Sequence, residues 1–246
     1  MKYKKFVRLY SYSRISKYYK AANGDKNKAQ MLYFANMKIA QSFHPLLSAF
    51  EVILRNQLHY ALARHFSDGA WIIHQKTGFM VAPSLTYQDK RTKKMVTNDY
   101  LLKEVQKAEK KIAGRGAYVT AGRVIAEQTI GFWNSLYEVH HYALLCGVPG
   151  SIFRRLPSGY GRKEINDAIW RIRELRNRIN HNEPICFVCG RCDFSYVREM
   201  YVLINSFLSW IDPAIMPSLQ EVDKVLRVIS KEEQKQNSCQ ENRFRK

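Results

Sequence analysis

Residues 174–184 read ELRNRINHNEP, and they end a segment whose apolar residues recur every three or four positions. This spacing puts the apolar side chains on one face of a helix and predicts a helix over residues 162–180. Pro184 cannot continue a helix, so the helix is expected to end just before it. The predicted apolar face consists of Ile165, Ala168, Ile169, Ile172, Leu175 and Ile179.

Arg176 falls within the apolar arc of this predicted helix, beside Ile169 and Ile172. An unpaired charge is costly to bury, so its guanidinium is expected to meet a carboxylate, line a wet cleft or face a phosphate. Asn177 precedes His181 by four residues, a spacing at which its amide can hydrogen-bond to the imidazole. The alternative is structural: Arg176 is half-buried by its aliphatic stem, and His181 is a cation favoured at a helix C-terminus.

The motif Arg176-Asn177-x3-His181 resembles the R-N-x-x-x-H signature of HEPN ribonucleases. The following residues, NEPI at 182–185, are similar to the extended block of the Abi-like (abortive infection) HEPN family. Three further stretches resemble the same family: FEVILRN at 50–56, GFWNSL at 131–136 and LSWIDP at 208–213. The resemblance implies a helical bundle that dimerises and cleaves RNA without a metal ion. It also links the chain to phage defence through growth arrest.

The chain is strongly basic, with 40 lysines and arginines against 21 acidic residues and a net charge of +19. Such an excess is typical of proteins with a polyanionic partner, and nucleic acid is the first candidate. With 246 residues and 46% hydrophobic content, the chain can bury a full core. Aromatic residues make up 13% of the sequence, so some rings can stack on unpaired bases while most belong to the core.

The expected fold is all-α: a HEPN-like helical bundle with an elaborated N-terminal helical half. Residues 1–24 form a basic, tyrosine-rich arm with a short helix, which either grips phosphates or is a solvated, partly frayed segment. The helical domain spans residues 25–230, and a helix in it is expected to end or kink at His44-Pro45. The polar residues 231–246 are expected to form a disordered tail.

Other charged residues are candidates to support an RNA site. Glu51 and Arg55 lie within or beside the apolar face of the helix that follows Pro45, so they either pair with each other or reach Arg176. In the second case Glu51 holds Arg176, or Arg55 joins it as a second phosphate ligand. Residues 67–98 form a long irregular segment, interpreted as an RNA-facing flap. The basic candidates there and just before the motif helix are Lys90, Arg91, Lys93, Lys94, Arg154 and Arg155.

Cys186, Cys189 and Cys192 have a spacing that invites a zinc interpretation. No histidine follows them as a fourth ligand, so neither a metal nor another cofactor is expected. The chain has five cysteines, an odd number without the spacing of a disulfide framework. No apolar run approaches the roughly 20 residues of a membrane span, and no secretory apolar core follows the basic amino terminus, so a cytoplasmic location is expected. Reduced thiols are expected in that compartment.

The chemistry that these side chains can carry out is transesterification of RNA. The 2′-hydroxyl attacks the adjacent phosphorus and leaves a 2′,3′-cyclic phosphate and a 5′-hydroxyl end. In this hypothesis His181 moves protons, Arg176 stabilises charge on the phosphate, and Asn177 orients the histidine. One histidine per chain makes a sparse site, so a homodimer with both motif helices in one cleft is expected, as the resemblance also implies.

RNA is the expected partner, as a substrate and as a regulatory or antitoxin RNA. Two other classes of function stay open. The chain can be a non-catalytic RNA-binding protein that holds a structured RNA, with Arg176 and Asn177 contacting phosphates. It can also be a structural interaction protein that uses its basic arm, in which case it binds no RNA in a salt-dependent manner.

Overall fold

The computed structural model describes residues 1–188 and 190–244, with side chains for all of these except 188 and 237–244. Helices hold 69% of the chain and strands only 4%, so the expected all-α class is confirmed. No helix among the described residues is long and apolar enough to cross a membrane. The chain forms two compact units, the first made of residues 1–49, 174–209 and 213–246, the second of residues 50–173 and 210–212.

The long helix α3 (Lys26–His65) contributes its first part to the first unit and its second part to the other. The helix does not end at His44-Pro45, which is one of the two outcomes expected there, because Pro45 lies within this continuous helix of 40 residues; a kink there stays a prediction. A proline removes one backbone donor and commonly ends or kinks a helix. Phe43 and Leu46 on either side of it are fully buried, so packing of the apolar face outweighs the local cost.

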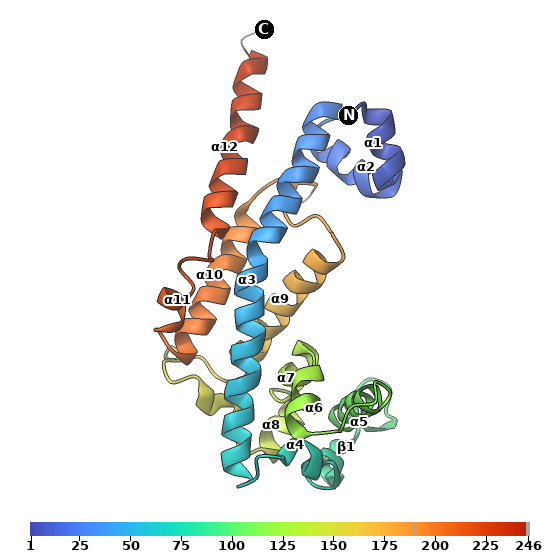
Figure 1. Cartoon of the computed structure of the whole chain (residues 1–246), viewed down its shortest axis with the longest axis vertical. Coiled ribbons are helices and arrows are strands. Elements are labelled where there is room, and N and C mark those ends of the chain that lie inside the picture. Colours follow the sequence, from blue (N-terminus) through green and yellow to red (C-terminus); the bar gives the residue numbers. More distant parts are fainter. Residues whose placement is uncertain (189, 245–246) are drawn as a thin grey trace. The chain divides into compact units, whose positions relative to one another are not determined.

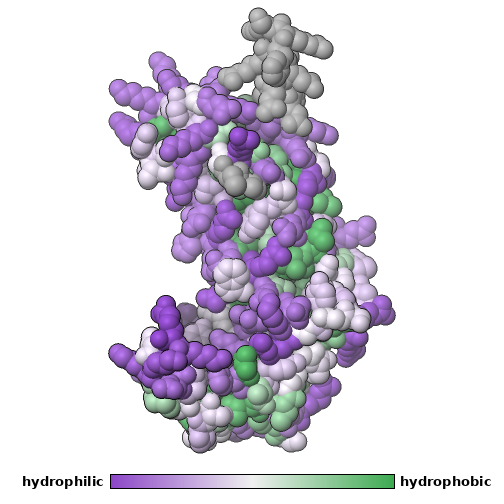
Figure 2. Space-filling view, turned by 180° about the vertical axis from the view of Figure 1, so that it is seen from behind, coloured by the Kyte–Doolittle hydropathy of each residue, from purple (hydrophilic) through white to green (hydrophobic). Residues whose placement is uncertain are grey.

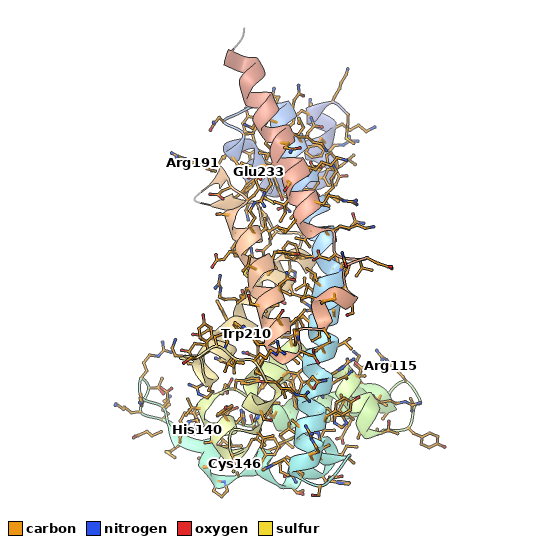
Figure 3. The ribbon with its side chains drawn as sticks, turned by 90° about the vertical axis from the view of Figure 1, so that its left-hand side faces the viewer. Arg115, His140, Cys146, Arg191, Trp210 and Glu233 are labelled. Carbon is orange, nitrogen blue, oxygen red and sulfur yellow. The ribbon has the colours of Figure 1, made fainter. Side chains whose placement is uncertain are left out.

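The first unit is built around the N-terminal part of α3, beside which α1 and α2 lie (Figure 1). Glu233 of α12, labelled in Figure 3, forms an ion pair with Arg198 of α10. The first unit also contains the last turns of α9 and an antiparallel hairpin whose two strands have two residues each. The bounds are α1 Tyr3–Tyr10, α2 Tyr12–Ala21, α9 Arg162–Asn180, β3 Phe187–Val188, β4 Arg191–Cys192, α10 Ser195–Ile211, α11 Ile215–Ser218 and α12 Val225–Phe244.

The N-terminal arm is packed, so the frayed alternative is wrong. Residues 1–24 hold two helices rather than one, and Phe6, Ile15 and Tyr18 are fully buried. The Phe6 ring meets that of Tyr33 in α3 edge-on, with centroids 5.5 Å apart. Phosphate binding by the arm stays a prediction. Its basic side chains stand at the surface, which is hydrophilic over this region (Figure 2): Lys2, Lys4, Lys5, Arg8, Lys17 and Lys20 are exposed.

The last helix is longer than predicted. We expect a disordered tail over residues 231–246, whereas α12 continues to Phe244; residues 245–246 lie outside the described part. Part of the difference follows from Glu232, which is only 4% exposed and accepts hydrogen bonds from Lys38 at 3.1 Å and Lys235 at 2.7 Å. The ion pair with Lys38 links this part of α12 to α3, and a polar composition does not reveal such a contact.

The second unit consists of shorter elements. α6 packs against α4 and α5, and α5 packs against α7. Arg115, which follows α5 and is labelled in Figure 3, forms an ion pair with Glu127 at the end of α6, and the two charged groups are 2.6 Å apart. The bounds are α4 Trp71–His74, η1 Gln75–Thr77, η2 Phe79–Val81, η3 Pro83–Leu85, β1 Thr86–Gln88, β2 Met95–Thr97, α5 Tyr100–Ala113, α6 Ala121–Glu127, α7 Ile130–Ser135, α8 Val139–Leu144 and η4 Val148–Ile152. Residues 67–98 are therefore short helical turns and one hairpin, not an irregular loop.

The packed arm has a direct consequence for stability. Phe6→Ala should lower the free energy of unfolding by about 3 to 5 kcal/mol, since it opens a cavity in an aromatic cluster. Leu9→Ala on the same helix is the control, because Leu9 is 58% exposed, and its effect should stay within about 0.5 kcal/mol. Urea-induced unfolding of both variants measures the difference. Equal stability of the two variants would mean that the arm does not pack as described.

Candidate active site

The helix that carries the motif is formed as predicted. α9 spans Arg162–Asn180, and each of the six residues of its predicted apolar face is at most 5% exposed. Arg176 is half-buried beside this face, as are Asn177 and Arg178. The apolar periodicity thus predicts both the helix and the side that it buries.

His181 follows the last residue of α9 and is exposed to solvent. Its backbone N–H donates to the carbonyl oxygen of Asn177 at 2.9 Å, so the helical hydrogen-bond pattern extends to it. Within the described part of the chain no hydrogen bond joins the Asn177 and His181 side chains. The predicted orienting contact is therefore not made, and the imidazole stands at the surface at the end of a helix.

The chain leaves α9 through a Schellman motif. Asn182 has φ 52°, a left-handed conformation that asparagine adopts more readily than most residues. The N–H of Glu183 donates to the carbonyl oxygen of Arg178 at 2.8 Å, and that of Asn182 donates to Ile179 at 3.0 Å. Backbone hydrogen bonds of the helix itself thus determine where it ends, one turn before Pro184.

Two side chains from other helices hold the residues that follow. Arg14 of α2 donates to the carbonyl oxygen of Asn182 at 2.6 Å. Asn36 of α3, which is 2% exposed, donates to the carbonyl oxygen of Glu183 at 3.2 Å and accepts from the N–H of Ile185 at 2.7 Å. Hydrogen bonds therefore connect residues 182–185, which follow His181, to α2 and α3.

Neither Arg14 nor Asn36 is singled out by the sequence motif. The available signal for Asn36 is its position, because it replaces an apolar residue on the buried face of α3 between Leu32 and Ile39. A buried amide needs partners, and the backbone of a segment without regular structure needs them equally. The hydrogen bonds between the Asn36 amide and the backbone of residues 183 and 185 satisfy both groups.

The side chain of Arg178 also contacts residues 183 and 184 after the helix end. Its guanidinium donates to the carbonyl oxygen of Pro184 and lies 3.9 Å from a carboxylate oxygen of Glu183. The guanidinium carbon is also 4.9 Å from the centroid of the Tyr196 ring, a cation–π distance. Arg178 therefore stabilises the turn and is not available to a ligand in the way that an extended surface arginine is.

A groove of about 540 Å³ lies against this helix end within the first unit. Its walls come from α2, from α3 and from two residues at the end of α9, Ile179 and Asn182. Because Asn182 follows His181 directly, the groove and the candidate catalytic histidine are neighbours. Its exposed lining residues are Phe34, Met37, Lys38, Gln41, His44 and Asn182.

The remaining predicted site residues belong to the second unit, so the contacts expected between Glu51 or Arg55 and Arg176 stay predictions. Glu51 and Arg55 are both half-buried on α3. The basic cluster forms the tip of the β1–β2 hairpin, where Asp89 accepts from the N–H of Thr92 at 2.6 Å and tightens the turn. Six cations of this unit are exposed as expected: Lys90, Arg91, Lys93, Lys94, Arg154 and Arg155.

Two of the three clustered cysteines can be placed. Cys186 is buried and Cys192 is half-buried on the β3–β4 hairpin, whereas Cys189 lies outside the described residues. Burial raises the pKa of the Cys186 thiol and raises that of Cys192 to about 11. Both thiols are therefore protonated and unreactive at neutral pH. Over residues 1–188 and 190–236 no group of three potential ligand side chains is close enough to hold a metal.

Comparison of the chain with protein-family models, with curated proteins and with solved structures finds no match.

The role of Asn36 can be tested by stability. Asn36→Ala leaves the buried N–H of Ile185 without its acceptor, so it should cost about 1 to 3 kcal/mol in the free energy of unfolding. Asn27→Ala on the same helix is the control, since Asn27 is exposed, and should cost about 0.5 kcal/mol or less. Urea unfolding measures both. An Asn36→Ala variant as stable as the control would show that this amide does not hold the turn.

Proposed function

We propose that this chain is a metal-independent endoribonuclease of the HEPN type, similar to the Abi-like (abortive infection) family, that acts in phage defence or as a growth-arresting toxin. One observation carries the proposal: an exposed His181 stands on a backbone that the Schellman motif and Arg14 hold in place. It lies four residues after Asn177 and five after Arg176. The net charge of +19 supports a polyanionic substrate.

The proposed reaction is an attack of the ribose 2′-oxygen on the adjacent phosphorus. A bond forms between that oxygen and phosphorus, and the bond from phosphorus to the 5′-oxygen of the next nucleotide breaks. One imidazole accepts the proton of the 2′-hydroxyl, and one imidazolium donates a proton to the leaving 5′-oxygen. Arg176 neutralises the charge that gathers on the non-bridging oxygens. DNA lacks the nucleophile and is not a substrate.

The reaction needs a base and an acid in the same step, and one His181 cannot be both. We therefore propose a homodimer in which a two-fold axis brings the two copies of the motif into one cleft. The exposure of His181 supports this arrangement, because a second chain can reach it. A dimer is expected in light scattering under assay conditions. A chain that is monomeric there and retains full cleavage activity would contradict the shared site.

A second candidate function is RNA binding without cleavage. It is favoured by the four exposed cations at the tip of the β1–β2 hairpin, since lysine and arginine contact phosphates without any chemistry. In this case the motif residues contribute positive charge and hydrogen-bond donors only.

Substitution of the histidine separates the two functions. His181→Ala should lower the rate of RNA cleavage by about 10²- to 10⁴-fold, because it removes proton transfer, while RNA affinity changes little. His65→Ala is the control, since His65 is also exposed but lies in the second unit. Sequencing of RNA 5′-hydroxyl ends after expression of each variant measures cleavage, and growth measures toxicity.

The pattern of outcomes decides between the candidates. Cleavage and toxicity that disappear in His181→Ala and persist in His65→Ala support the nuclease. If wild type and His181→Ala yield the same 5′-hydroxyl ends and the same growth, His181 is not catalytic and the binding function is favoured.

A further inference from the structure

We propose that the groove between α2, α3 and the end of α9 is a subsite for one unpaired base of single-stranded RNA. The inference rests on the proposed function, in which RNA is the substrate. It identifies the surface that binds part of the RNA strand. Asn182 lines the groove and directly follows His181, so a base in the groove is positioned beside the nucleotide at His181.

The size of the groove fits this occupant. Its volume of about 540 Å³ lies in the range of roughly 300 to 1,000 Å³ that is usual for small-molecule sites. One nucleotide fills such a space with room for ordered water. The neighbouring nucleotides of a strand then continue over the surface, where the chain is basic.

The groove offers a fixed aromatic ring. Phe34 is 40% exposed, and its ring is held from behind by those of Phe6, Tyr10 and Tyr33, with centroids 5.8, 6.5 and 5.6 Å away. Met37, one turn further along α3, is 42% exposed. An exposed ring that is already fixed loses little freedom when a base stacks on it, and any of the four bases can do so. The polarizable thioether of methionine adds a compatible surface.

The polar residues of the groove suit a nucleotide better than an apolar ligand. Gln41, His44 and Asn182 are exposed and offer hydrogen bonds to a base edge or sugar. Lys38, half of whose side chain is exposed, brings a positive charge that Glu232 partly balances. No acidic side chain lines the groove among the residues that the structure describes.

One of the lining residues carries a buried polar atom without a partner among the residues that the structure describes. Tyr18 lines the groove and has no exposed surface, yet its hydroxyl has no hydrogen-bond partner in the described part of the chain. A buried hydroxyl without a partner is energetically unfavourable.

The experiment uses two substitutions on one helix. Met37→Glu places a carboxylate in the groove, and Met31→Glu places the same charge on α3 outside it, at a residue that is 37% exposed. Both are made in the His181→Ala chain so that the RNA stays intact. The probes are a fluorescein-labelled 12-nucleotide oligouridylate and a strand of equal length with an intact ribose-phosphate backbone but no bases. Fluorescence anisotropy gives the dissociation constants.

We expect Met37→Glu to weaken oligouridylate binding about tenfold and Met31→Glu less than about twofold, with equal affinity of the two variants for the abasic strand. Equal weakening by both variants, or a loss by Met37→Glu that is as large on the abasic strand, would overturn the base subsite. Either of the two contradicting results would leave the nuclease proposal unaffected, because neither concerns cleavage. If the parent chain binds neither strand in a salt-dependent manner, the proposed RNA substrate fails, and the subsite fails with it.

Discussion

Hydrogen bonds between side chains of two helices and the backbone after His181 fix the candidate site. The chain turns there without forming a helix or a strand of its own, and backbone groups in such a turn are costly to leave unpaired. Asn36 satisfies one carbonyl and one N–H, and Arg14 satisfies the carbonyl of Asn182. Because these partners come from α2 and α3, the histidine keeps a defined position relative to the N-terminal helices.

The hydrogen bond from Arg14 gives the N-terminal helices α1 and α2 a structural role at the candidate site, in addition to their positive charge. α1 and α2 pack on α3 through Phe6, Ile15 and Tyr18, and that packing places Arg14 at the end of α9. α2 and α3 also form most of the walls of the groove next to Asn182. The site is therefore assembled from segments that are far apart in the sequence, and loss of the arm is expected to affect both the turn and the groove.

Local patterns predict one part of the structure well. The apolar face of α9 depends only on a spacing of three and four residues, so six side chains could be assigned to the core in advance. Contacts distant in sequence could not be assigned. Arg14 and the carbonyl of His181 are 167 residues apart, and Glu232 reaches Lys38 from α12. Pro45 shows the same limit, since a local rule predicts that the helix ends or kinks there, whereas tertiary packing keeps it continuous.

Amide hydrogen exchange at residues 183–185, followed by NMR, tests most directly whether the turn after His181 is held. The N–H of Glu183 donates to Arg178 and that of Ile185 donates to the buried Asn36 side chain. Both amides should exchange as slowly as those in the last turns of α9. Exchange at the rate of an unstructured peptide would contradict the account, because His181 would then stand on a mobile end rather than on a fixed one.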